Sequence, residues 1–335
     1  GEDGRKKIVA ITRYLTVVLA LIESTAMAVG FGRQGLLKEY NFVNAAIVVL
    51  TLTAGSAFLM WIGERITEKG VGNGISIVLV INILSRVPSD MTTLFNQFVK
   101  GKSLASGGLA VLIILAIIVA MVVFVILLQD GERRIAVQYS QKIAGRKTFG
   151  GQSTHIPLKV NTAGVIPIIF ASSLMQFPIV IASFLGKGNG SGIGSEILRG
   201  MNQGNWLNPD QIKYSWGLIV YIVLTVFFAY FYTSITFNPL EIANNMKKSG
   251  GFIPGIRPGK PTVEYLTKRL NYIIFIGACG LVVVQVVPIF FNGWFGANVS
   301  FGGTSLIIIA SVILETLKQI ESQMLVRNYK GFLSN

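Results

Sequence analysis

Long runs of apolar residues alternate with short polar segments along the whole chain. Eight such runs cover residues 8–30, 42–62, 75–84, 104–128, 163–185, 214–237, 271–291 and 299–317. Runs of about 20 apolar residues have the length that an α-helix needs to cross a bilayer. Lipid offers the backbone no hydrogen-bond partners, so each run is expected to be a helix. The pattern predicts an all-α, polytopic membrane helix bundle with eight transmembrane helices.

The third run, residues 75–84, is short for a transmembrane helix. It can span a bilayer only if the helix starts near Gly72 and continues past Arg86. We therefore expect a helix that is longer than its apolar stretch.

Composition supports a membrane protein. Hydrophobic residues make up 52% of the 335 residues and charged residues 13%, whereas soluble domains carry about 25% charged residues. The single cysteine, Cys279, and the single histidine, His155, exclude an internal disulfide and a paired-histidine zinc site. The stretch Gly101-Lys-Ser resembles the end of a P-loop, but Asn96 stands where the motif requires glycine. We expect no catalytic residue, no metal and no cofactor, and hence no enzyme.

Positive charge is distributed unequally between the two sides of the predicted membrane domain. Eight spans place both termini on the same side. Of the 29 Lys and Arg residues, 21 fall on the side of the termini and 8 on the other side. Lys and Arg in short loops favour the cytoplasm, so both termini are predicted to be cytoplasmic.

Two basic segments on the predicted cytoplasmic side, residues 130–162 and 238–270, are 33 residues long each. Helix connections are usually much shorter. These loops could simply flank the helices and face anionic lipid. However, four of their cations lie more than ten residues from any predicted span, namely Arg146, Lys147, Arg257 and Lys260. This spacing favours a surface that binds a partner.

Helix breakers and polar residues interrupt several of the runs. Pro167 and Pro178 fall in the fifth run and Pro288 in the seventh, while Glu23 is the only charge well inside a run. Prolines kink helices, and polar residues at such positions could face water or mobile neighbours. Ordinary hydrogen bonds between helices explain the polar residues equally well.

Five stretches carry a resemblance to a known family. They read TRYLTVVLALIES, TAGSAFLMWIGERITEKGVGNGISI, ERRIAVQYSQKIAGRKTFGGQSTHIPLKVNTAGVIPIIFASS, FNPLEIANNMKKSGGFIPGIRPGKPTVEYL and FGGTSLIII. Together, and in this order, they resemble the SecY family, the pore subunit of the bacterial protein-translocation channel. The resemblance begins just before the third family helix. Counterparts of the first two helices and of the plug segment between them are absent, so we expect the sequence to be a piece of a longer protein.

The resemblance implies a channel fold made of two five-helix halves related by inverted symmetry. Residues 1–103 would then supply the last three helices of the first half. Residues 104–335 would supply the five helices of the second half, together with the cytoplasmic loops 130–162 and 238–270.

The family also implies an hourglass pore with an apolar ring at its waist. The matching positions are Ile75, Leu79, Ile169 and Ile308. An apolar constriction dewets and so resists ion leak, while flexible side chains can part around a polypeptide. A lateral gate releases membrane helices into lipid, and the residues matched to the gate or pore lining are Asn73, Ser172, Ser173, Gln176 and Phe177. Apart from the resemblance, all of these could be ordinary packing or lipid-facing residues.

Partners follow from the same resemblance. The two basic loops match those that bind the motor ATPase SecA and the ribosome, with Lys142, Arg146, Lys147, Arg257 and Lys260 as the matching cations. Lys and Arg that neutralise RNA phosphates release counterions, and Arg suits bidentate carboxylate contacts. The family further implies the SecE and SecG subunits, signal sequences, nascent polypeptides and the lipid bilayer as partners.

The function expected from the resemblance is the central subunit of a protein-conducting channel in the bacterial plasma membrane. Such a channel passes unfolded preproteins across the membrane and releases membrane helices laterally. The alternative is a secondary transporter of a small solute, and broken helices alone do not separate the two. The long basic loops and the scarcity of intramembrane charge favour the channel.

Overall fold

A computed structural model describes residues 2–33, 35, 37, 39–139, 142–144, 147–149, 153–184, 192–296 and 304–332. The chain forms two compact units. Unit 1 comprises Gly1–Ser85, Gln176–Leu198 and Glu315–Asn335, and unit 2 comprises Arg86–Met175 and Arg199–Leu314. Boundaries between the units fall inside α3 (Gly74–Phe98), α5 (Ile166–Phe184), α6 (Ile193–Met201) and α10 (Thr304–Phe332), so each of these helices contributes to both units.

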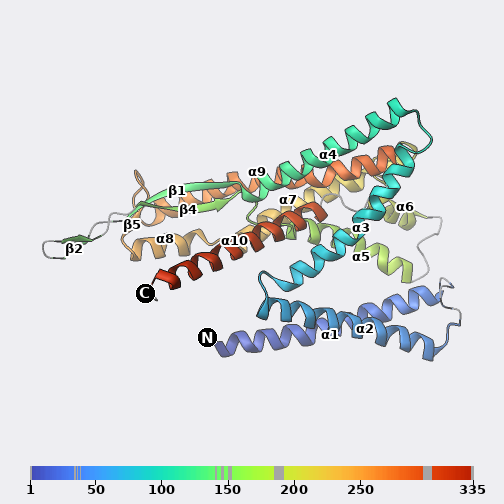
Figure 1. Ribbon diagram of the computed structural model, residues 1–335, viewed down its shortest axis with the longest axis horizontal. Helices are drawn as coiled ribbons and strands as arrows, with labels where there is room; N and C mark the ends of the chain where they lie inside the picture. The colour runs from blue at the N-terminus through green and yellow to red at the C-terminus, as the bar shows by residue number, and fades with distance from the viewer. Residues whose placement is uncertain are drawn as a thin grey trace. The chain divides into compact units, whose positions relative to one another are not determined.

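Unit 1 is built around a hairpin of two long helices, α1 (Glu2–Arg33) and α2 (Phe42–Lys69), which lie side by side in Figure 1. Small buried residues of α1, among them Ser24 and Ala28, allow the helices to approach closely. Thr53 of α2 donates a hydrogen bond to Ser24 Oγ at 3.3 Å. Arg13 and Glu64 form an ion pair at 2.7 Å between the same two helices. Packing and polar contacts therefore both fix the hairpin.

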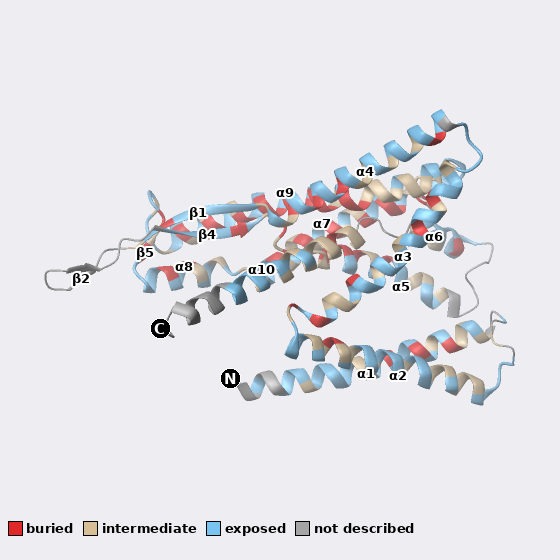
Figure 2. Cartoon of the chain, in the orientation of Figure 1, coloured by how far each residue is buried: buried red, intermediate tan, exposed pale blue. Residues whose placement is uncertain are grey.

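Unit 2 is centred on α9 (Lys260–Phe295), which packs along α7 (Trp216–Thr236) and contacts α4 (Leu104–Asp130). Figure 2 shows many buried residues along α9, whereas α1 and α2 are mostly exposed. The core of unit 2 includes Val125, Ile168, Val284 and Ile307, from four different helices, all 0% exposed. Its apolar helices thus enclose a well-packed core.

The structure describes the connection between α5 and α7 from residue 192 onward. This part contains α6 (Ile193–Met201) and two 3-10 helices, η1 (Gln203–Asn205) and η2 (Pro209–Ser215). Trp206 is 0% exposed and donates its indole N–H to the carbonyl oxygen of Gly200 at 2.6 Å. Buried indole N–H groups usually find such a partner. The indole also lies against the ring of Tyr221 in α7, with ring centroids 5.3 Å apart, so this part of the connection is anchored to α7.

The two segments interpreted as loops from the sequence are largely folded. The strand β1 (Glu132–Tyr139) pairs antiparallel with β4 (Ser153–Lys159), and β5 (Gly251–Phe252) pairs with the end of β1. A second hairpin joins β2 (Lys142–Ala144) to β3 (Lys147–Phe149), and α8 (Pro239–Lys248) precedes β5. Figure 1 shows β1, β4, β5 and α8 beside the first part of α9. A common core includes Ile135, Leu158, Met246, Ile253 and Leu266. The sequence interpretation named these segments only as loops between spans, and the structure shows in addition that they bury a hydrophobic core of their own.

The long apolar runs form helices as predicted. Within the described residues, six helices are long and apolar enough to cross a membrane: Lys7–Gly32, Phe42–Lys69, Gly74–Phe98, Ala105–Asp130, Pro209–Lys248 and Lys260–Phe295. The other two predicted spans fall on α5, which contains a shorter apolar helix, and on α10. The third run lies in α3, which starts two residues after Gly72 and passes Arg86. The mainly helical membrane fold is confirmed, and the count of eight spans stays a prediction.

Candidate functional site

The helix α5 has two contrasting faces. Its residues Ile168, Ala171 and Met175 are at most 1% exposed and belong to the core of unit 2. The predicted ring residue Ile169 and three predicted gate residues, Ser172, Ser173 and Gln176, follow the spacing i, i+3, i+4 and i+7. This spacing places them on a single face of a helix.

That second face of α5 is open. Ile169 is 43% exposed and the neighbouring gate residue Phe177 is 63% exposed. Ser173 and Gln176 are also exposed, while Ser172 is half-buried and donates its hydroxyl to the carbonyl oxygen of Ile169 at 3.0 Å. The face therefore offers apolar and small polar side chains that are not committed to the core.

The remaining predicted ring residues lie on α3 and α10. Ile75 and Leu79, four residues apart on α3, are 53% and 48% exposed. Ile308 on α10 is half-buried and follows Ile307, which is 0% exposed. All three helices that carry ring candidates, α3, α5 and α10, contribute to both units of the chain.

The turn between α2 and α3 is held by local hydrogen bonds. Asn73 accepts the backbone N–H groups of Ile75 at 3.1 Å and of Ser76 at 3.3 Å, and so caps the start of α3. Thr67 accepts the N–H of Gly74 at 2.9 Å. Asn73 was predicted to line the pore, and this stays a prediction; in the structure Asn73 is exposed and caps the start of α3.

A contact between the same turn and α10 was not predicted. The backbone N–H of Gly72 donates to Gln319 Oε1 at 2.8 Å. The two residues are 247 positions apart in the sequence. Gly72 belongs to one of the stretches that carry the family resemblance, but Gln319 does not, and a single sequence carries no local signal for such a pairing.

The segment around Arg257 is an ordered double turn. Ile256 N–H donates to the carbonyl oxygen of Ile253 at 3.0 Å, across Pro254 and a Gly255 with φ of +80°. Proline followed by a glycine with positive φ is the signature of a type II turn. Ile253 is 4% exposed and anchors the turn in the core that it shares with β1 and α8.

A second Pro-Gly pair follows directly after Arg257. Gly259 has φ of +106° and precedes α9, whose first residue is Lys260. Thr262, which is 0% exposed, donates its hydroxyl to the carbonyl oxygen of Arg257 at 2.9 Å. The backbone of Arg257 is thus fixed, while Arg257 and Lys260 are exposed. Lys260 Nζ is 4.0 Å from a carboxylate oxygen of Glu264.

The cations of the other basic segment are only partly described. Lys142 begins β2 and Lys147 begins β3, and Ala144 pairs with Lys147 across this hairpin. Arg146 lies outside the described residues. The hairpin places Lys142 and Lys147 on adjacent strands.

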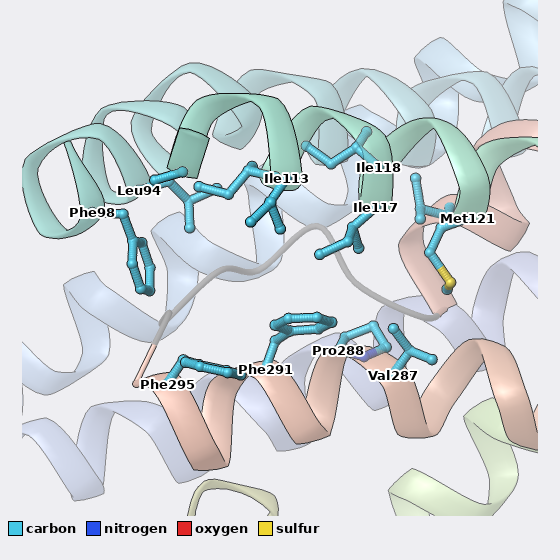
Figure 3. Close-up of a pocket in the computed structure, with 13 residues that line it drawn as sticks. Leu94, Phe98, Ile113, Ile117, Ile118, Met121, Val287, Pro288, Phe291 and Phe295 are labelled. Carbon is cyan, nitrogen blue, oxygen red and sulfur yellow. The ribbon is translucent and has the colours of Figure 1, made fainter. Parts of the chain in front are cut away.

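Unit 2 contains an apolar cavity of about 310 Å³. Figure 3 shows side chains of α4, including Ile113 and Met121, opposite Val287 and Phe291 of α9, with Leu94 and Phe98 of α3 at one end. Every residue that lines this cavity is apolar. Such a lining provides no polar group that could orient a solute or perform chemistry, in contrast to typical small-molecule sites.

Comparison with solved structures defines the fold class. A SecY structure described for the plug domain that stabilises its closed state has a TM-score of 0.65 at 19% identity, over 96% of this chain and 75% of that one. A protein-conducting channel structure has a TM-score of 0.65 at 17% identity, over 96% and 74% of the two chains. Sec61 from a canine ribosome-channel complex has a TM-score of 0.60 at 17% identity, with the same coverage. The chain has the fold of protein-conducting membrane channels.

Sequence comparison then identifies the family. The SecY family model matches residues 1–317. Protein translocase subunit SecY of Corynebacterium glutamicum is 43% identical over 99% of this chain and 76% of that protein. SecY of Bacillus subtilis is 42% identical over 100% of this chain and 77% of that protein. The chain belongs to the SecY family and is a membrane-embedded subunit of a protein-conducting channel.

Proposed function

We propose that α3, α5 and α10 line the pore of this channel, with Ile75, Leu79, Ile169 and Ile308 as its apolar ring. The main support is that one face of α5 is buried in the core of unit 2, whereas the face that begins at Ile169 is open. An apolar constriction excludes water and ions while the channel rests. Branched aliphatic side chains can change rotamer and separate when a polypeptide passes.

The rest of the open face of α5 is proposed to belong to the lateral gate. Ser172, Ser173, Gln176 and Phe177 are small, polar or exposed, which suits a helix that must separate from its neighbour. Asn73 is proposed to lie on the pore side of α3. Through this gate, signal sequences and nascent membrane helices would leave the pore and enter lipid.

The sheet, α8 and the double turn around Arg257 are proposed to form the surface that binds SecA or the ribosome. An arginine on a fixed turn loses little conformational freedom when it binds. Carboxylates of a motor protein or phosphates of ribosomal RNA are suitable counterparts. Lys142, Arg146, Lys147 and Lys260 would extend this basic surface. These partners would supply the energy, and the chain itself would be a passive conduit, not an enzyme.

We further propose a location in the bacterial plasma membrane, with both termini of this chain in the cytoplasm, in accord with its asymmetry of Lys and Arg. Residues 1–103 would contribute three helices to the first half of the channel and residues 104–335 five helices to the second. SecE and SecG would be its companion subunits.

The ring proposal is tested with Ile169→Asn and Ile308→Asn in the full-length protein, assembled with its companion subunits. Both substitutions should increase ion conductance of the resting channel and translocation of a preprotein with a defective signal sequence, because polar side chains hydrate the constriction. Ile181→Asn is the matched control, since Ile181 on α5 is 42% exposed but lies about 120° away around the helix. If both ring variants left the resting conductance and the translocation of the defective-signal preprotein unchanged, the ring would be refuted.

A further inference from the structure

We infer that Gln319 is a positioning residue for the pore ring, because its side chain bonds the turn before α3 to α10. This inference rests on the proposed ring. Gln319 acts through the backbone of Gly72, three residues before Ile75.

The contact is specific and closely packed. Gly72 is buried, has φ of +88°, and donates its N–H to Gln319 Oε1 at 2.8 Å. A Cβ atom at position 72 would lie 3.0 Å from Thr316 Oγ1 and 3.3 Å from Ile77 Cδ1. Thr316 and Gln319 are three residues apart and therefore neighbours on the surface of α10. Glycine thus permits both the backbone conformation and the approach of α10.

The turn that contains Gly72 is held to α2 and α3 by several hydrogen bonds. Gly70 N–H donates to Ile66 at 2.7 Å, Gly74 N–H to Thr67 at 2.9 Å, and Asn73 caps α3. These bonds stay within the helical hairpin of α2 and α3. The bond from Gly72 leaves the hairpin and reaches α10. A displacement of Gln319 would therefore shift the start of α3 as a rigid turn, together with Ile75 and Leu79.

The geometry of α10 connects the same contact to Ile308. Residues 308 and 319 are eleven positions apart, so they lie about 20° apart around the helix and about 16 Å apart along it. The adjacent Ile307 is 0% exposed in the core of unit 2, whereas Gln319 belongs to unit 1. The helix α10 therefore carries the ring candidate Ile308 and, eleven residues later, the side chain that bonds to the turn before Ile75 and Leu79.

The expected consequence concerns the closed channel. With the bond intact, the ring residues of α3 and α10 keep a fixed register and the constriction stays narrow. Without it, the turn before α3 moves independently of α10, and the closed state loses one part-buried hydrogen bond that favours it. Resting conductance and translocation of preproteins with defective signal sequences should then rise.

The test uses Gln319→Leu, which removes the acceptor at similar volume, and Gln319→Glu, which keeps an acceptor oxygen. Gln323→Leu is the matched control, since Gln323 is an exposed glutamine one turn further along α10. All are made in the full-length protein in its assembled complex. Gln319→Leu should increase translocation of a defective-signal preprotein about fivefold, whereas Gln319→Glu and Gln323→Leu should stay within about twofold of the wild type.

If Gln319→Leu only made the protein less stable, without any effect on the pore ring, the results would differ. Such a variant would be less abundant and would translocate normal preproteins less efficiently, and its translocation of preproteins with defective signal sequences would not increase. The inference is overturned if Gln319→Leu does not raise translocation of the defective preprotein, or if either comparison variant raises it equally. Ile169→Asn and Ile308→Asn, measured in parallel, separate the two proposals. If these two variants increase translocation of the defective-signal preprotein and Gln319→Leu does not, only the role of Gln319 is refuted. If they too have no effect, the ring itself is refuted.

Discussion

The backbone of Gly74, the first residue of α3, lies directly against the carbonyl oxygen of Gly63 in α2. A Cβ atom on Gly74 would collide with this oxygen, and one on Gly63 would lie 2.8 Å from Ile75 Cγ1. The two glycines thus allow α2 and α3 to cross where α3 begins. The crossing also fixes Ile75, the first predicted ring residue.

We predict that Gly74→Ala displaces the start of α3. The obstacle is backbone, which cannot rotate away as a side chain could, so the helices must separate. The thermal unfolding midpoint in detergent should fall by several degrees, consistent with a loss of about 1–3 kcal/mol for overpacking. Resting conductance should also rise, because Ile75 moves with the turn.

Gly55→Ala is the appropriate control for this prediction. Gly55 lies in the interior of α2, and no atom lies within 4 Å of a Cβ placed there. Alanine favours a helix over glycine by about 1 kcal/mol. Gly55→Ala should therefore leave the midpoint unchanged or raise it slightly. An equal decrease in both variants would show that the crossing imposes no steric requirement.

A second prediction concerns the polar contact between α7 and α9. Thr225 Oγ1 donates to Gln285 Oε1 at 3.2 Å, and the two residues are 0% and 3% exposed. In Thr225→Val the glutamine loses its partner within an apolar core, so the variant should be less stable by about 0.6–2 kcal/mol. Unfolding of the purified protein in detergent measures this. Thr267→Val is the control, since the exposed Thr267 bonds only within its own helix, to Val263; an equal loss there would argue against a special role for the buried pair.

The sequence predicted the membrane helices well because their signal is local. Lipid requires about 20 consecutive apolar residues, and α4 and α7 begin and end within two residues of the predicted runs. The extended helix α3 also follows from its sequence, since a run of ten apolar residues cannot span alone. The start of α9 was placed eleven residues too late, because its first turns, from Lys260, are amphipathic and lie in the core with β1 and α8.

The sheet was missed although a signal was present. In β1, Ile135 and Val137 are buried and alternate with exposed residues, and Ile156 of β4 pairs with Ile135. This period of two is typical of a half-buried strand, but both strands are short, and β1 begins with three charged residues. The contact of Gly72 with Gln319 could not be predicted, because it depends on how two distant helices pack.

The double turn around Arg257 leads to a third prediction. Gly255 has φ of +80°, and no atom lies within 4 Å of a Cβ placed there. Gly255→Ala therefore tests backbone conformation alone and should cost about 1–2 kcal/mol locally. We expect weaker SecA-driven translocation with unchanged charge. Gly108→Ala on α4, where there is also free space but φ is not positive, should have no such effect.

The fourth prediction is that Arg257→Glu strongly reduces SecA-driven translocation by the full-length channel. Arg257 is exposed, and its backbone is fixed by Thr262 and by two Pro-Gly pairs, so its side chain is available to a partner. Reversal of a charge that pairs across an interface costs about 2–5 kcal/mol, which corresponds to a decrease of about thirtyfold or more in partner affinity. Arg257→Lys should lose less, because it keeps the charge but not the bidentate geometry.

The control is Lys248→Glu, which changes the net charge by the same amount at an exposed position of α8. It should stay within about threefold of the wild type. If Lys248→Glu impaired translocation as much as Arg257→Glu, the surface would act through its total charge, and the double turn would have no specific role in presenting Arg257.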